Sequence, residues 1–360
     1  MADVFSRAFT RSRPFAFGAF GVALIATVLP AHAEQPIAPI VLPGDHLHPE
    51  SLSIAPDGMA YIGSMTGGVL KVRLRDRSVK RFVPPGFYGS GALFGVYVDT
   101  RHGLLWTCTN SFSAPGTKVE GADPGHWVKA FDLKTGAGKV SLPMPGDNPM
   151  CNDFALGPDG GVYITDTGQP RLLRWKPGAR ALDVWAEDPV FNALPAAGGV
   201  PRKGGLDGLA FGSDGAIYAN NVRDGSLYRV IVQPDGRAGA ITRLIPDRPL
   251  QSPDGMRTMG GMTFLLAEGV GRIARLTVAG AAVHVETLAE GIKDPTGVDV
   301  HAKPGHAKPG HALMGWYVQA QLSGLFNPDK APAVQLPFKL SPVTLPVTLP
   351  VTLSPAHPGK

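Results

Sequence analysis

A phrase that returns about every fifty residues constrains the fold of this chain more than any other feature. Each copy reads as a short apolar strand, a polar turn with a Gly, two further residues, an aromatic residue and a second β-rich strand. The Gly accepts a positive φ in a tight turn, and the aromatic side chain favours a strand that packs between sheets. The phrase therefore predicts five similar β-hairpins, whose Gly and aromatic pairs are Gly58 and Tyr61, Gly103 and Trp106, Gly160 and Tyr163, Gly215 and Tyr218, and Gly261 and Phe264.

The sequence between the hairpins completes a four-stranded unit in each repeat. A third strand that alternates apolar and polar residues follows each hairpin, and a weaker fourth strand leads to the next copy. A sixth, degenerate copy pairs TGVDVH with ALMGWYVQA across a duplicated His-Ala-Lys-Pro-Gly insertion. We therefore predict an all-β fold, a six-bladed β-propeller with four antiparallel strands per blade. A β-sandwich or two smaller β domains would give no reason for six similar phrases.

The two ends of the chain have a different character from the repeats. Arginines followed by an apolar run at 15–29 and by Ala31-His32-Ala33 predict a secretory signal peptide at 1–33. The alternative, a membrane anchor, is disfavoured because the run is shorter than the roughly 20 residues of a spanning helix. We place the propeller at 43–338 and a low-complexity Pro/Thr tail at 339–360. The protein is expected to be exported, periplasmic or secreted, without stable membrane insertion.

The net charge and the two cysteines indicate which partners and which redox state to expect. The formal net charge is +5, and no run of Lys or Arg forms a basic stripe, so no nucleic-acid partner is expected. A small-molecule substrate is expected instead, and the sequence specifies no oligomeric state. Cys108 and Cys151 should lie on the same face of neighbouring blades, as either one disulfide or two buried thiols.

Polar residues stand where the first strand of several blades begins. In a propeller these strands line the central channel, so their starting residues converge on one face. The residues at the six starts are Glu50, Phe94, Asn152 with Asp153, Asp207, Asp254 and Thr296. Carboxylate and amide oxygens grouped in this way suit Ca²⁺ better than Zn²⁺. The alternative is that each is only a turn or strand-end residue, as we expect for Asp57, Asp159 and Asp214 in the hairpin turns on the opposite face.

The motifs HPES, CNDF-x-LGPDG, GLDGLAF-x-SDG and SPDGM resemble those of the senescence marker protein, gluconolactonase and luciferin-regenerating enzyme family. The resemblance covers about 47–338 and implies a propeller with a central Ca²⁺ or another divalent cation such as Mn²⁺, Mg²⁺ or Zn²⁺. It implies the metal ligands Glu50, Asn152, Asp207 and Asp254. Asp207 stands where the family generally has Asn, which adds charge to the site. Met150 stands where sugar-lactone hydrolases of the family tend to have Arg, so gluconolactone is not the expected substrate.

The resemblance also implies a reaction, the metal-dependent hydrolysis of a lactone or related ester. The metal would act as Lewis acid, Asp254 as general base, and Asn152 would orient substrate or water. The ends of the second strands return to the same face and offer further pocket-lining candidates, of which Asn110 and Asn221 are predicted to bind substrate; the others are Asp166, Glu268 and Gln319. Two alternatives remain open: a non-catalytic binding propeller with a structural metal, and a lyase or condensing enzyme on the same scaffold.

Overall fold

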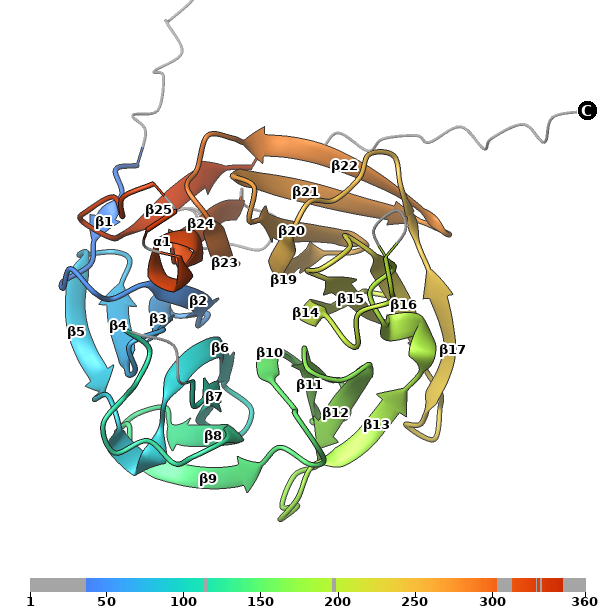
Figure 1. Cartoon of the computed structure of the whole chain (residues 1–360), viewed down its shortest axis with the longest axis horizontal. Coiled ribbons are helices and arrows are strands. Elements are labelled where there is room, and N and C mark those ends of the chain that lie inside the picture. Colours follow the sequence, from blue (N-terminus) through green and yellow to red (C-terminus); the bar gives the residue numbers. More distant parts are fainter. Residues whose placement is uncertain are drawn as a thin grey trace, which may run out of the picture. The chain divides into compact units, whose positions relative to one another are not determined.

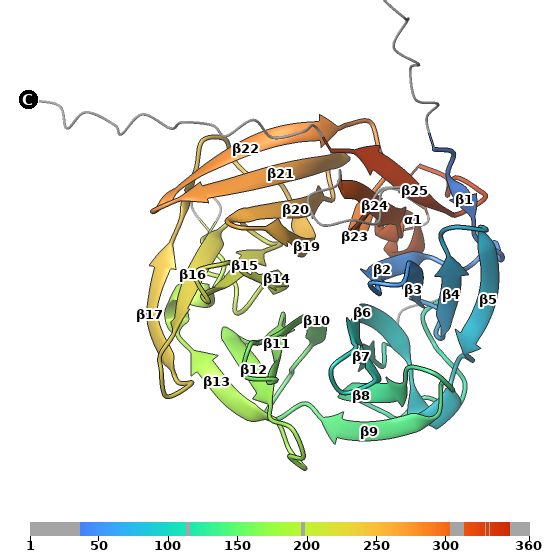
Figure 2. The same cartoon turned by 180° about the vertical axis from the view of Figure 1, so that it is seen from behind.

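Six β-sheets stand around a central axis in the computed structural model, which describes residues 37–112, 116–195, 199–302, 313–327, 329–330 and 332–345. Figure 1 views the ring of sheets along this axis, and Figure 2 shows the same ring from behind. Each sheet contains four antiparallel strands in radial order from the axis outward, and one sheet carries a short fifth strand at its outer edge. The prediction of an all-β, six-bladed propeller is therefore confirmed.

The strands follow one another along the chain from the inside to the outside of each blade. The first three blades contain β2 (Pro49–Ile54), β3 (Met59–Ser64), β4 (Val69–Arg73) and β5 (Ser78–Val83); β6 (Ala92–Asp99), β7 (Leu104–Asn110), β8 (His126–Asp132) and β9 (Gly138–Pro143); and β10 (Cys151–Leu156), β11 (Val162–Asp166), β12 (Arg171–Trp175) and β13 (Asp183–Glu187). The next two contain β14 (Leu206–Phe211), β15 (Ile217–Asn221), β16 (Leu227–Val232) and β17 (Ala238–Arg243); and β19 (Pro253–Gly260), β20 (Thr263–Glu268), β21 (Arg272–Ala279) and β22 (Ala282–Ala289). Short elements connect them: the 3₁₀ turns η1 (Phe87–Gly89) and η2 (Pro189–Phe191), and β18 (Ile245–Pro246), which adds a parallel edge to β22.

The sixth blade closes the ring by joining the two ends of the described chain. It contains β23 (Pro295–Ala302), β24 (Leu313–Gln319), β25 (Lys339–Thr344) and, outermost, β1 (Ile40–Val41). Ile40 pairs with Leu340 and Val41 with Lys339. The predicted boundaries at 43 and 338 are therefore too narrow: residues 339–344, assigned to the tail, form a strand in which Leu340, Ser341 and Val343 are buried.

The repeated hairpins have the register and the packing that their sequences predict. Their strands pair antiparallel in every blade, and all five turn glycines have positive φ, from 60° to 80°. The five aromatic side chains are at most 2% exposed. They pack between neighbouring sheets, as in the contact of Tyr218 with Phe264, whose ring centroids are 4.9 Å apart. The aromatic of each phrase is thus an inter-blade core residue.

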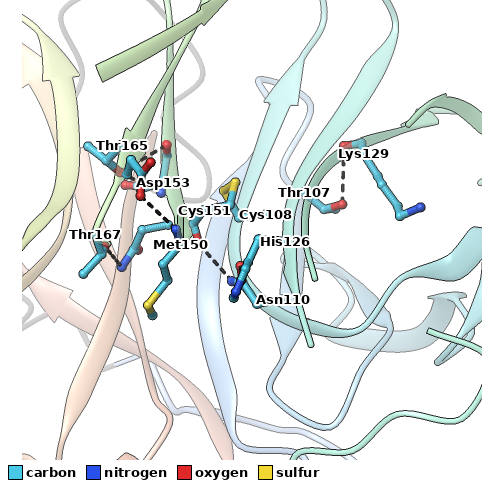
Figure 3. Close-up of a disulfide and its surroundings, with 12 residues drawn as sticks. Thr107, Cys108, Asn110, His126, Lys129, Met150, Cys151, Asp153, Thr165 and Thr167 are labelled. Carbon is cyan, nitrogen blue, oxygen red and sulfur yellow. Dashed lines mark hydrogen bonds between the residues drawn. A yellow bond between two sulfur atoms is a disulfide. The ribbon is translucent and has the colours of Figure 1, made fainter. Parts of the chain in front are cut away.

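A disulfide between Cys108 and Cys151 decides between the two states predicted for these cysteines. Cys108 lies near the end of β7 and Cys151 opens β10, so the bond joins the second and third blades (Figure 3). Both residues are fully buried. The predicted signal peptide and residues 346–360 of the predicted tail lie outside the described residues. No helix within the described ranges is long and apolar enough to cross a membrane.

Candidate active site at the propeller axis

All six innermost strands carry a register irregularity at or beside their starting residues. The pairing shifts at 49–51, 93–95, 151–154, 206–209, 253–256 and 295–298. A β-bulge of this kind turns a side chain out of the alternating pattern and re-aims it. The register shifts therefore give a local reason why the starting residues point toward the axis. The order of the strands brings these residues near the axis but does not by itself aim their side chains.

Glycines after several of these starts let neighbouring inner strands approach closely. A Cβ at Gly208 would lie 2.4 Å from the carbonyl oxygen of Asp254, and one at Gly255 would lie 2.7 Å from that of Thr296. Side chains at these positions are sterically excluded, so the Asp-Gly pairs here are not simple turns. The close approach brings Asp207 and Asp254, on adjacent blades, to a common cavity.

The convergence predicted for the strand starts is seen as a small cavity on the axis, with a volume of only about 10 Å³. Its lining contains five of the six predicted starting residues together with their neighbours: Glu50, Ser51, Leu52, Phe94, Asn152, Asp153, Asp207, Asp254, Gly255, Arg257, Gly297 and Val298. Thr296, the sixth, instead donates a hydrogen bond from its hydroxyl to the carbonyl oxygen of Glu50, 2.6 Å away. The four predicted metal ligands are thus lining residues of one cavity, contributed by four blades.

Glu50 and Asp207 bring carboxylate oxygens into this cavity that have no partner. Both side chains are buried, and Glu50 Oε2 and Asp207 Oδ1 have no hydrogen-bond partner among the described residues. Burial raises the pKa of Glu50 well above its usual value, and the nearby carboxylates of Asp254 and Asp207 raise it further. Burial likewise raises the pKa of Asp207, with Asp254 and Asp153 adding to the effect. Like charges held together away from water are stabilised by a cation between them.

Asn152 is fixed by two hydrogen bonds from its amide nitrogen. Nδ2 donates to Asp207 Oδ2 at 2.8 Å and to the hydroxyl of Thr167 at 2.9 Å. Thr167 in turn donates to the carbonyl oxygen of Leu206, on the next blade. With both amide hydrogens engaged, the carbonyl oxygen of Asn152 is the atom available to an ion or a substrate.

Asp254 differs from the other two carboxylates because it is partly exposed. Its Oδ1 accepts a hydrogen bond from the backbone amide of Gly255 at 2.8 Å. Burial raises the pKa of Asp254 to about 7, the amide of Gly255 opposes this rise, and Asp153 adds to it. Asp254 is therefore the carboxyl group of the cavity that combines access to solvent with a pKa near neutrality.

The donor set fits a hard divalent cation. It offers three carboxylates and one amide oxygen, and two of its buried oxygens lack any partner. No group of three or more His, Cys, Asp or Glu side chains in the described part of the chain is drawn close enough to enclose an ion already. The shared lining and the unpartnered oxygens are nevertheless chemically suited to such a cation.

The predicted substrate-binding residues Asn110 and Asn221 do not line this cavity. Asn110 donates to the carbonyl oxygen of Cys151 at 2.9 Å and accepts from His126, as Figure 3 shows. Asn221 donates to the carbonyl oxygen of Phe191 and accepts from the amide of Arg223. Both side chains are at most 1% exposed. The structure places them as anchors of the loops beside their own strands, with their hydrogen-bonding groups engaged.

The other second-strand ends hold loops or strand connections in the same way. Asp166 accepts from the amides of Met150 and Gly168, and Glu268 from the amide of Gln251. Gln319 donates to the carbonyl oxygen of Lys293. His48, beside Glu50 in sequence, contacts the carbonyl oxygen of Ala320 through Nδ1 at 2.7 Å and thereby ties the first blade to the sixth. The topology predicted that these residues share one face of the ring. It did not predict that their side chains would form hydrogen bonds with backbone groups.

Two charged residues of the cavity were not among the predicted ligands. Arg257 on β19 forms a bidentate ion pair with Asp153 on β10, at 2.5 and 2.9 Å. Asp153 was noted only as the neighbour of Asn152. The sequence signal that could have marked it is its position, because Gly occupies the equivalent place in four other blades.

One wall of the site is apolar. Phe94, which lines the cavity, packs against Phe112 with a centroid distance of 5.2 Å. Met150, Phe112 and two leucines of α1 (Leu322–Phe326), Leu322 and Leu325, pack at the edge of the same apolar cluster and are only partly buried. Figure 1 shows α1 beside the inner strands β2 and β23. Phe94 therefore connects the acidic cavity to a larger apolar cluster, to which these four side chains also belong.

Comparisons with known proteins identify the fold but no family. No protein-family model and no curated protein matches the sequence. Similar solved structures include a gluconolactonase structure, with 12% identity, a TM-score of 0.58 and coverage of 85% of this chain and 91% of that one. A luciferin-regenerating enzyme has 12% identity, a TM-score of 0.57 and coverage of 86% and 95%. The PQQ-bound aldose sugar dehydrogenase of Streptomyces coelicolor has 16% identity, a TM-score of 0.53 and coverage of 86% and 97%.

Two of these structures carry names from the family that the motifs resemble, and the third has a different chemistry. At such low identities the likeness extends to the propeller fold alone. The chain is therefore a six-bladed β-propeller that shares its fold with lactonase-like and sugar dehydrogenase proteins.

Proposed function

We propose that this protein is a divalent-metal-dependent hydrolase of a lactone or related ester. The observation that carries the proposal is the axial cavity, where Glu50 and Asp207 hold unpartnered oxygens beside the partly exposed Asp254. Glu50, Asn152, Asp207 and Asp254 would hold the ion, with Ca²⁺ favoured by the all-oxygen donor set. When bound, such an ion supplies Lewis acidity toward a carbonyl oxygen and lowers the pKa of water.

The chain's own residues would perform the proton transfer. Asp254 would take a proton from water as the water oxygen adds to the carbonyl carbon, and would return it to the leaving alkoxide oxygen when the acyl C–O bond breaks. Oδ1 of Asp254 is engaged with the amide of Gly255, so Oδ2 is the atom we assign to the proton. Asn152, whose amide plane is fixed, would orient the substrate or the water.

The apolar cluster that adjoins the cavity through Phe94 supports a particular kind of ester. Met150, Phe112 and the leucines of α1 offer no hydrogen bonds to the hydroxyl groups of a sugar lactone, but they fit an alkyl or aryl group. We therefore propose that the substrate bears an apolar substituent.

Export is part of the proposal. The predicted leader at 1–33 and the Cys108–Cys151 disulfide both suit an oxidising compartment, periplasmic or extracellular.

Substitution of the carboxylates tests the reaction. Glu50→Ala and Asp254→Ala should lower metal-dependent lactone hydrolysis on the order of a hundredfold or more, because each removes a metal donor and the latter also the base. Rates would be measured on aliphatic lactones and aryl esters with Ca²⁺, Mn²⁺ or Zn²⁺, and folding checked by circular dichroism. Asp183→Ala, in an exposed ion pair on β13, is the matched control. Unchanged rates in both site variants would remove the assignment.

Substitution of Met150 tests the substrate class. Met150→Arg puts a charged side chain into the apolar wall and should lower kcat/KM for long-chain lactones on the order of tenfold relative to short ones. A γ-lactone series of increasing alkyl length measures this ratio. Equal loss for every chain length would contradict an apolar subsite.

A second candidate function is a non-catalytic binding propeller with a structural metal. The observation that favours it is that the four proposed ligands come from four different blades, so an ion at the axis would tie the ring together. Metal-dependent stability without turnover of any lactone, aryl ester or phosphoester would support this alternative.

A further inference from the structure

Arg257 on β19 lines the carboxylate cavity and contacts residues of two other blades. Besides its bidentate pair with Asp153, its Nη2 donates to the carbonyl oxygen of Val96 on β6 at 3.3 Å. Its guanidinium stands 5.5 Å from the ring centroid of Tyr97. The residue is 7% exposed. A buried cation with this many fixed contacts has one position in the channel, and its charge is part of the site.

Asp153 differs from the other carboxylates of the cavity because it is paired with a cation. Both of its oxygens accept from Arg257, at 2.5 and 2.9 Å, whereas Glu50 Oε2 and Asp207 Oδ1 have no partner. Four acidic side chains line the cavity: Glu50, Asp153, Asp207 and Asp254. With Arg257 counted, the sum of formal charges is −3 instead of −4. Three carboxylates remain to attract a divalent cation.

We propose that Arg257 sets the net charge of the axial metal site by pairing with Asp153, and so tunes its affinity for divalent cations. Arg257 acts in this proposal as a positioning residue that keeps Asp153 out of the ligand set. The inference rests on the proposed metal site but not on lactone hydrolysis. In a buried site the effect of a unit charge on a nearby divalent ion is much larger than in water.

A charge-tuning role predicts effects of opposite sign for the two partners. Arg257→Met leaves Asp153 without its counter-charge and should tighten Ca²⁺ binding on the order of tenfold. Asp153→Asn leaves the guanidinium uncompensated and should weaken Ca²⁺ binding on the order of tenfold. The double variant Arg257→Met/Asp153→Asn keeps the wild-type sum of charges and should bind Ca²⁺ with an affinity within roughly threefold of wild type.

Arg257→Lys is the matched conservative variant. It keeps the positive charge but loses the bidentate geometry, so its Ca²⁺ affinity should stay closer to wild type than to Arg257→Met. Isothermal titration calorimetry with Ca²⁺, and Tb³⁺ luminescence as a second probe, measure all five proteins. Asp153→Asn, which is nearly isosteric, provides the test if Arg257→Met does not fold.

The outcomes separate this role from others. If both single variants weaken Ca²⁺ binding, Arg257 acts only as a structural link between blades, and the inference is overturned. If the double variant binds as weakly as Asp153→Asn, Asp153 is itself a ligand, and the inference is also overturned. If the wild-type protein binds neither Ca²⁺ nor Tb³⁺, both the proposed metal site and the role of Arg257 are wrong. If the wild-type protein binds Ca²⁺ and all variants bind it equally well, only the role of Arg257 is wrong.

Discussion

Individual acidic residues of this protein have different roles that follow from their place in the repeat. Asp159 and Asp214, in the hairpin turns, accept hydrogen bonds from turn amides and from the hydroxyls of Tyr163 and Tyr218, as suits residues that shape a turn. Asp207 and Asp254 lie at the opposite ends of the same kind of strand, where a bulge re-aims them to the axis. Aspartates in the hairpin turns therefore have hydrogen-bond partners for their carboxylate oxygens. Aspartates at the axial ends of the inner strands keep oxygens that are available to a ligand.

Glu268 is a buried carboxylate with a stabilising role. Burial by itself raises the pKa of Glu268, but hydrogen bonds from Arg248, from the amide of Gln251 and from Arg272 outweigh burial and hold the pKa below its ordinary value of 4.5. A carboxyl group with a lowered folded pKa contributes stability above its unfolded pKa, and this contribution is lost as the pH falls through the folded pKa.

Glu268→Gln should therefore destabilise the protein by about 2 kcal/mol at neutral pH, because it removes charge-assisted hydrogen bonds. The difference from wild type should shrink as the pH falls below about 4.5. Urea unfolding at several pH values measures this. Asp183→Asn, in an exposed pair with Lys176, should stay within about 0.5 kcal/mol. A constant difference between Glu268→Gln and wild type at every pH would show that the charge is not responsible.

A covalent bond joins strands of the second and third blades. The disulfide links β7 to β10 across 43 residues of sequence, and Asn110 adds a hydrogen bond to the carbonyl oxygen of Cys151. The next residue along β10 is Asn152, so this link also supports the strand that presents a proposed ligand. A fixed β10 keeps the geometry between Asn152 and Asp207.

Replacing both cysteines by serine should lower the free energy of unfolding by about 2–4 kcal/mol, because the open chain gains entropy when unfolded. Thermal or urea unfolding of the double variant, beside wild type with and without reductant, measures the loss. A thiol count on unreduced wild-type protein should find no free thiol, since both cysteines are paired. Equal midpoints for variant and oxidised wild type would contradict a stabilising bond.

The ring as a whole has two closures, one at its edge and one proposed at its axis. At the edge, β1 completes the sheet of β23, β24 and β25, so residues 40–41 and 339–344 hold the first and last blades together. At the axis, the proposed ion would be bound by residues from the first, third, fourth and fifth blades. Such an ion binds the folded ring but not the unfolded chain, so it should raise stability through mass action.

Ca²⁺ at about 100 times its dissociation constant should therefore stabilise the protein by about 2.7 kcal/mol, and excess EDTA should remove this effect. In a domain of about 300 residues the shift in Tm is roughly 4 °C. Differential scanning calorimetry with EDTA and with Ca²⁺ measures it, and Glu50→Gln, which lacks one ligand charge, should respond much less. A wild-type Tm that neither addition changes would argue against an axial cation.

The sequence was sufficient for the architecture because the repeat is encoded locally. Turn glycines such as Gly160 and aromatic residues such as Tyr163 recur at a fixed offset, and six similar hairpins have few ways to bury their faces other than a ring. The sequence was also sufficient to place Glu50, Asp207 and Asp254 in the lining of one cavity, because equivalent positions of a propeller converge.

The repeat pattern could not predict contacts between segments that are distant in sequence. The engagement of Asn110 and Asn221 by backbone groups, the pairing of Arg257 with Asp153 across the channel, and the capture of residues 339–344 by β1 and β24 all depend on which partner comes close once the ring has closed. Hydrogen bonds and ion pairs form over about 3 Å, so they are specified by three-dimensional proximity, which a periodic sequence determines only to the nearest blade.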